Sequence, residues 1–160
     1  MNASTTTASA TAPSARASSA TSSSRDPASI DAVSFGRFVE LGGRILLASL
    51  FLLSGLTKLS AYGATAAYMA STGVSAALLP IVIATELLGS LAVILGWHTR
   101  IAAFLLAGFT LLAAGFFHNH FGDQIQMIMF LKNVSIAGAF LILVANGAGP
   151  LSLDHRRSAR

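Results

Sequence analysis

The chain has 160 residues, of which 54% are hydrophobic and 10% are charged, and its formal net charge is +4. Soluble domains carry about 25% charged residues, whereas the apolar residues here form long runs with almost no charge, which indicates an integral membrane protein. The absence of cysteine excludes disulfide bonds and thiolate metal ligands within this chain. The basic residues are divided between the tails and the helix ends, so we expect no nucleic-acid partner.

Residues 1–29 consist almost wholly of Ser, Thr and Ala, with two arginines and two prolines. This composition buries too little apolar surface to offset chain entropy, so we expect a disordered tail. A Ser-rich tail that contains Arg superficially resembles an organellar transit peptide, but we favour a low-complexity bacterial tail. We identify no secretory signal within it, because it lacks an apolar stretch.

Four apolar runs follow, each close to the roughly 20 residues that a bilayer core requires. The predicted fold class is all-α, an integral membrane four-helix bundle, with spans at about residues 38–58, 76–96, 101–119 and 125–145. Part of the connection between the first two spans is expected to lie as an interfacial helix, because it carries the headgroup-level types Tyr62, Tyr68 and Met69. Residues 155–160 form a basic C-terminal tail.

Arginines fall on one predicted side of the membrane, which is the side that carries both termini and the middle connection: Arg25, Arg37, Arg100, Arg156, Arg157 and Arg160. The positive-inside rule therefore predicts cytoplasmic termini in a multi-pass protein. Gly, Ala and Ser inside the spans permit the close backbone approach that holds helices together in lipid.

Three charged residues lie inside the predicted spans, where an unpaired charge is costly. At 1.5 Å per residue, Arg44, Glu86 and Lys132 lie at about 9, 15 and 20 Å from the membrane edge that carries the termini. All three could meet if the helices tilt. We expect His118 and Lys58 nearer the opposite rim, where a Lys side chain can extend outward to water.

Two interpretations of these groups stay open. In the first, Glu86 pairs with Arg44 or Lys132 and only fixes the helix register. In the second, two cations and one acid in a low dielectric leave a positive pocket for an anionic or carbonyl-bearing ligand, such as a quinone. Arg44 also has Glu40 four residues earlier on its own helix, which offers a local partner.

A metal centre at His118, His120 and Asp123 is not favoured. Residues two apart point to opposite sides of a helix, so these two histidines converge only if the helix has already ended. We interpret them as interfacial residues and predict no metal site.

Short motifs in a particular order resemble the DoxX family of small bacterial membrane proteins over about residues 36–154. They are Gly43-Arg44-Ile45-Leu46-Leu47 with Phe51-Leu52-Leu53-Ser54-Gly55-Leu56-Thr57-Lys58, then Glu86-Leu87-Leu88-Gly89 with Leu95-Gly96 and Thr99-Arg100, then Phe117-His118-Asn119, Leu131-Lys132-Asn133 and Gly149-Pro150-Leu151-Ser152-Leu153-Asp154.

The resemblance implies a four-helix protein of the bacterial inner membrane, whose relatives are linked to quinone-coupled thiosulfate oxidation, redox-defence complexes and quinone stress. Most members have no established activity. The polar residues that burial cost singles out also match the family pattern, so the candidate ligand-binding residues are Arg44, Glu86, Lys132, His118, Asn133 and Lys58.

We therefore expect an accessory or quinone-interacting subunit of a membrane oxidoreductase or redox-stress system, not catalytic on its own. The expected partners are the lipid bilayer, a redox enzyme and further copies of the chain, and quinone is the candidate ligand, with no cofactor carried by the chain itself. Two alternatives stay open: a small proton-linked transporter or permeability protein for organic anions, and a structural membrane scaffold.

Overall fold

The computed structural model describes the backbone of residues 27–159 and the side chains of residues 35–159. Its elements in chain order are α1 (Pro27–Ser60), α2 (Tyr62–Ser71), the 3₁₀ turn η1 (Ala76–Leu78), α3 (Leu79–Leu95), α4 (Thr99–Phe117), α5 (Gln124–Asn146) and α6 (Leu153–Ser158). Four helices are long and apolar enough to cross a membrane, at Phe35–Ser60, Ala76–Leu95, Thr99–Phe117 and Gln124–Asn146. The predicted all-α, membrane-spanning fold class is thus confirmed.

The predicted N-terminal tail falls mostly outside the described residues, but its last three residues do not. α1 begins at Pro27, so residues 27–29 are helical rather than part of a tail. Proline is well suited to a first helical turn, because its missing N–H would have no partner there.

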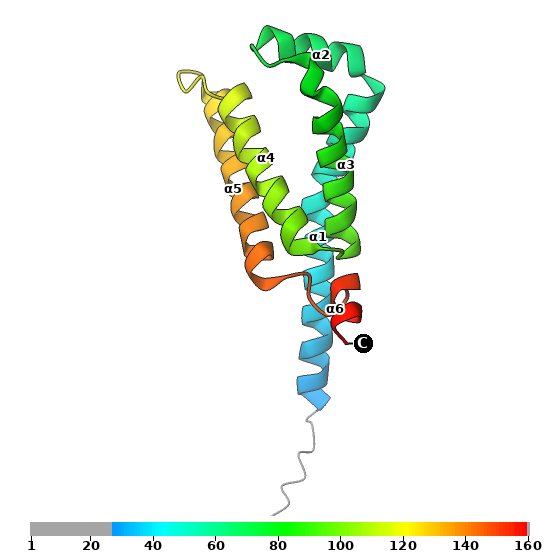
Figure 1. The fold of residues 1–160 in the computed structure, drawn as a ribbon. Coiled ribbons are helices and arrows are strands. Elements are labelled where there is room, and N and C mark those ends of the chain that lie inside the picture. The colour runs from blue at the N-terminus through cyan, green and yellow to red at the C-terminus, as the bar shows by residue number, and fades with distance from the viewer. Residues whose placement is uncertain (1–26, 160) are drawn as a thin grey trace, which may run out of the picture.

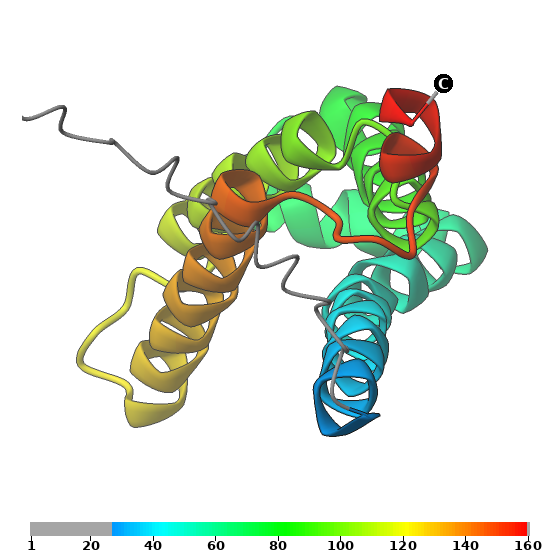
Figure 2. The ribbon, with the colours of Figure 1, turned by 90° about the horizontal axis from the view of Figure 1, so that it is seen from below.

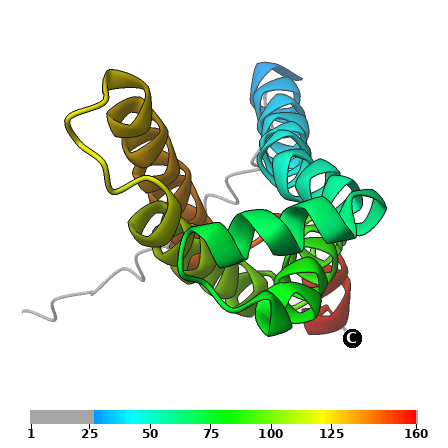
Figure 3. The same ribbon diagram turned by 90° about the horizontal axis from the view of Figure 1, so that it is seen from above.

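The helix ends coincide with residues that favour such ends. Gly96 follows α3 in the left-handed region, with φ of +70°, where glycine carries no steric penalty. The Asp123 carboxylate accepts from the backbone N–H of Ile125 at the start of α5, and the Ser152 hydroxyl accepts from His155 at the start of α6. The predicted interfacial helix is present as α2, which lies across one end of the bundle (Figures 1 and 3).

The helices are arranged as an open bundle rather than a closed ring. Close packing joins α1 to α3, α3 to α4 and α4 to α5. α1 and α5 lie at the two edges of this series (Figures 2 and 3), and the α4–α5 pair diverges from α1 and α3 toward the end covered by α2 (Figure 1). The half of the bundle nearer α2 is therefore the more open half.

Small and aromatic side chains fill the half nearer the termini. A buried cluster there contains Ala48, Ala103, Ala107 and Phe140, and the rings of Phe51 and Phe140 meet edge to face with centroids 5.3 Å apart. Small residues let helices approach closely in a membrane, where lipid is as apolar as the helix surface. This packed half lies below the open half in the view of Figure 1.

Candidate functional site

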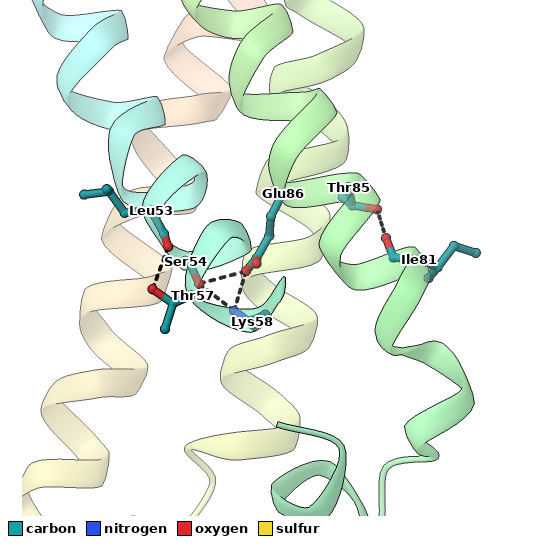
Figure 4. A network of polar contacts seen from close by, with 7 residues as sticks. All are labelled: Leu53, Ser54, Thr57, Lys58, Ile81, Thr85 and Glu86. Atoms are coloured by element: carbon teal, nitrogen blue, oxygen red, sulfur yellow. Dashed lines mark hydrogen bonds and ion pairs between the residues drawn. The ribbon is translucent and has the colours of Figure 1, made fainter. Parts of the chain in front are cut away.

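The buried carboxylate of Glu86 is held by a lysine from the neighbouring helix (Figure 4). Lys58 Nζ lies 2.9 Å from Glu86 Oε1, and the Ser54 hydroxyl donates to the same oxygen at 3.2 Å. Lys58 also donates to Ser54 Oγ, one turn earlier on α1. The Lys58 side chain is 26% exposed and that of Glu86 is 4% exposed, so the acid is buried and the cation is partly accessible.

The direction of the Lys58 side chain explains why this pair forms. Side chains on a helix tilt toward its N-terminus, and α1 enters the membrane from its N-terminal end. Lys58, in the last turn of α1, therefore extends back into the bundle instead of outward to the rim. The prediction that Glu86 pairs with Arg44 or Lys132 is therefore wrong.

The Glu86 carboxylate can accept further hydrogen bonds. Its second oxygen, Oε2, is buried and has no hydrogen-bond partner among the described residues. Nearby hydroxyls do not compete for it, because Thr57 and Thr85 donate to the carbonyls of Leu53 and Ile81 in their own helices (Figure 4). An unsatisfied buried polar atom in a native protein calls for a specific explanation, such as a ligand or an ion.

A pocket of about 460 Å³ lies in the open half of the bundle, beside the Lys58–Glu86 pair. Its walls come from α1 to α5 and are mainly Leu, Ile, Val, Met and Phe side chains. Its polar lining includes five of the six predicted ligand-binding residues, namely Lys58, Glu86, His118, Lys132 and Asn133. Pockets for small organic ligands are usually of this size and combine apolar walls with a few polar groups.

Two of these polar residues are oriented by neighbours. His118 follows the last residue of α4, and its Nδ1 lies 2.9 Å from the side-chain oxygen of Gln126 on α5. Lys132 is exposed, and its ammonium lies 3.2 Å from the sulfur of Met129. Among the charged lining residues Lys132 is thus the exposed one, whereas Lys58 is partly buried and Glu86 is buried.

α2 covers the end of the pocket. Its Met69 is buried, and the ring of Tyr68 stacks on Phe117 of α4 with centroids 5.6 Å apart. All three residues line the pocket. The interfacial helix predicted from its Tyr and Met residues therefore forms one wall of the candidate site.

Arg44 does not belong to this pocket. Its guanidinium donates to the carbonyl of Val93 at 3.3 Å and to the carbonyl of Leu151. The side chain is buried near the end of α3 that lies opposite the pocket, where helix carbonyls lack intrahelical partners and attract a cation. Arg44 consequently fixes the segment that leads to α6 instead of contacting Glu86.

Asp154 completes this second polar cluster. Its two carboxylate oxygens accept from the backbone N–H groups of His98 and Thr99, each at 2.8 Å, and its own N–H donates to the Gly96 carbonyl at 2.8 Å. Burial raises the pKa of the Asp154 carboxyl, but hydrogen bonds from Thr99 and His98 and the nearby His98 charge outweigh this effect. The net result is a pKa below the usual value.

No group of three His, Asp or Glu side chains gathers as metal ligands within residues 35–159. Asp123 serves as the N-cap of α5.

Two features of the site lie outside the predicted set of residues. The signal for Ser54 is its spacing of four from Lys58, which places both residues on one helix face. Asp154 lies two residues after the N-cap Ser152, in the first turn of α6, where an acidic residue normally indicates only a favourable interaction with the local helix dipole. Its hydrogen bonds to His98 and Thr99 at the start of α4 depend on the tertiary fold.

The chain is similar to known membrane proteins. The family model described as DoxX matches residues 39–119. Inner membrane protein YqjF of Escherichia coli K12 is 43% identical over 111 residues, which cover 69% of this chain and 85% of that protein. Inner membrane protein YphA of the same organism is 39% identical over 120 residues, which cover 71% and 86%. No solved structure gives a significant match.

Proposed function

The chain belongs to the DoxX family of inner membrane proteins, and we propose that it is an accessory, quinone-interacting subunit of a membrane oxidoreductase or redox-stress system. The observation that carries this proposal is the apolar pocket with the Lys58–Glu86 pair in its lining. Neither relative's name states a ligand, so the ligand is inferred from the chemistry of the pocket alone.

The pocket suits a flat, apolar molecule with carbonyl groups. The ammonium of Lys58 and the ring of His118 can donate hydrogen bonds to carbonyl oxygens, and the side-chain amide of Asn133 can do the same. Phe109, Phe116 and the aliphatic walls offer contact to a ring and an apolar tail. A quinone supplies all of these features, and its electrons would pass to or from a partner enzyme.

Access to the pocket is compatible with a ligand dissolved in the bilayer. α1 and α5 both line the pocket but are not among the closely packed helix pairs. A ligand can therefore enter between them from the lipid. The half nearer the termini is closed by the packed core, which is why we place quinone binding ahead of transport across the membrane.

We also propose that both termini are cytoplasmic. Arg37, Arg100, Arg156 and Arg157 lie at the end of the bundle that carries the described chain ends (Figure 1). Lys58 and Lys132 lie in the other half, where Lys58 forms a salt bridge with Glu86. The positive-inside rule assigns the arginine-rich end to the cytoplasm.

The test is equilibrium binding of decylubiquinone to the purified full-length protein in lipid nanodiscs. Ala113→Phe places a ring at the wall of the pocket and leaves all polar lining residues in the sequence, whereas Leu105→Phe places a ring on an exposed face of the same helix. We expect saturable binding to wild type and Leu105→Phe, and binding about tenfold or more weaker to Ala113→Phe. Absence of saturable binding to wild type, or equal binding to both variants, would overturn the proposal.

A further inference from the structure

A second concave site lies at the opposite end of the bundle from the candidate quinone pocket. It has a volume of about 370 Å³ and is lined by Leu95, Trp97, Leu153, Arg156 and Arg157. Two cations, one indole ring and two aliphatic side chains thus meet in one hollow, and its lining contains no acid. The proposed function makes no use of it.

The hollow is fixed in place although α6 has only six residues. The backbone N–H of Asp154 donates to the Gly96 carbonyl, and the Asp154 carboxylate accepts from the backbone N–H groups of His98 and Thr99. Arg44 holds the carbonyl of Leu151 from the other side. Each carboxylate oxygen of Asp154 thus accepts from the start of α4, and among the described residues Asp154 forms no salt bridge with Arg156 or Arg157.

The position of the hollow relative to the membrane limits the kinds of ligand that it can bind. Leu95 is the last residue of a membrane-spanning helix and is 55% exposed, so its side chain lies at the edge of the hydrocarbon. Trp97 follows in the turn and is 46% exposed, as expected for a residue at the headgroup level. Arg156 and Arg157 are exposed on α6 beside it. A ligand here meets hydrocarbon and water within one binding site.

We propose that this hollow binds the headgroup of an anionic phospholipid, with its phosphate against Arg156 and Arg157 and its acyl chain along Leu95. Arginine binds phosphate oxygens through paired N–H donors. Clusters of basic residues at the membrane edge attract anionic lipids. An acyl chain accounts for the exposed leucine and the indole, which a free phosphate ion would leave without contact.

The sequence supplies a direct reporter of occupancy, because Trp97 is the only tryptophan in the chain. The full-length protein is reconstituted in phosphatidylcholine bilayers that contain increasing amounts of a lipid with brominated acyl chains, which quenches indole fluorescence on contact. The brominated lipid is phosphatidylglycerol in one series and phosphatidylcholine in the other.

We expect brominated phosphatidylglycerol to reach half-maximal quenching at a mole fraction about fivefold or more below that of brominated phosphatidylcholine. The preference should be lost in the double variant Arg156→Gln/Arg157→Gln and weakened by high salt. It should persist in Arg37→Gln, which removes one exposed positive charge at the same end of the bundle but outside the hollow.

A second double variant, which keeps both positive charges, distinguishes loss of the charges from misfolding. Arg156→Lys/Arg157→Lys should retain most of the preference for phosphatidylglycerol. Equal quenching of wild type by the two brominated lipids would overturn the proposal. So would a preference that survives Arg156→Gln/Arg157→Gln, or one that Arg37→Gln abolishes equally.

Discussion

The ion pair between Lys58 and Glu86 predicts an asymmetric response to substitution. Lys58→Met leaves a carboxylate that is 4% exposed without its cation, whereas Glu86→Gln leaves an ammonium on a side chain that is 26% exposed and can turn toward water. Glutamine also keeps the size of glutamate and a side-chain oxygen that can accept from Ser54. The lysine variant should therefore be the less stable one.

The magnitude follows from the burial of each partner. Removing one member of a fully buried pair costs about 3–5 kcal/mol. Because Lys58 is partly exposed and Ser54 still donates to Glu86, we expect Lys58→Met to lower the free energy of unfolding by about 2 kcal/mol. Glu86→Gln should cost about 1 kcal/mol, and the double variant should resemble Glu86→Gln because no buried charge remains without a partner.

The measurement is reversible unfolding in mixed micelles, with SDS as denaturant and far-ultraviolet circular dichroism as the signal. Lys132→Met is the control, because Lys132 is exposed and forms no ion pair with the described residues. It should change stability by about 0.5 kcal/mol or less. Equal losses in Lys58→Met and Glu86→Gln, or strictly additive losses in the double variant, would refute the pairing.

Three further predictions concern the second polar cluster and the topology. Gly96→Ala should destabilise the protein by about 2 kcal/mol or more, because its φ is +70° and an added Cβ would lie 2.5 Å from the Arg44 guanidinium. Gly108→Ala is the control in the same unfolding assay. It should be neutral or stabilising, because an added Cβ at Gly108 meets no atom within 4 Å. Asp154 has a lowered pKa, so its contribution is present above its usual pKa and is lost as the pH falls through the folded value; an acid titration of stability should show this loss in wild type but not in Asp154→Asn. In this cysteine-free chain, Ser158→Cys should be labelled by a membrane-impermeant maleimide only after lysis and Ser71→Cys in intact spheroplasts; the reverse pattern would contradict cytoplasmic termini.

The membrane-spanning helices were predictable because their cause is local. A run of about 20 apolar residues is a sufficient signal for a span, and Gly96 and Asp123 mark helix ends through their own backbone and side-chain chemistry. The start of α1 could not be predicted in this way, because residues 27–37 are too polar to be identified as part of a membrane span, although they belong to the same helix.

The site was predictable only in part, because burial cost identifies a residue but not its partner. Glu86 is costly in hydrocarbon wherever it points, so it could be singled out from its position alone. Its pairing with Lys58 depends on the rotation of α1 and on the backward tilt of its side chains. Arg44 binds the carbonyl of Leu151, 107 residues away, and no local pattern predicts such a contact.

Purification from native membranes in mild detergent tests most directly our proposal that the open half of the bundle holds a quinone for a redox partner. Copurifying quinones and proteins are identified by mass spectrometry for wild type and Ala113→Phe. We expect a quinone and an oxidoreductase to copurify with wild type, and the quinone to be lost from Ala113→Phe. Preparations that contain no quinone, or equal amounts in both, would contradict it.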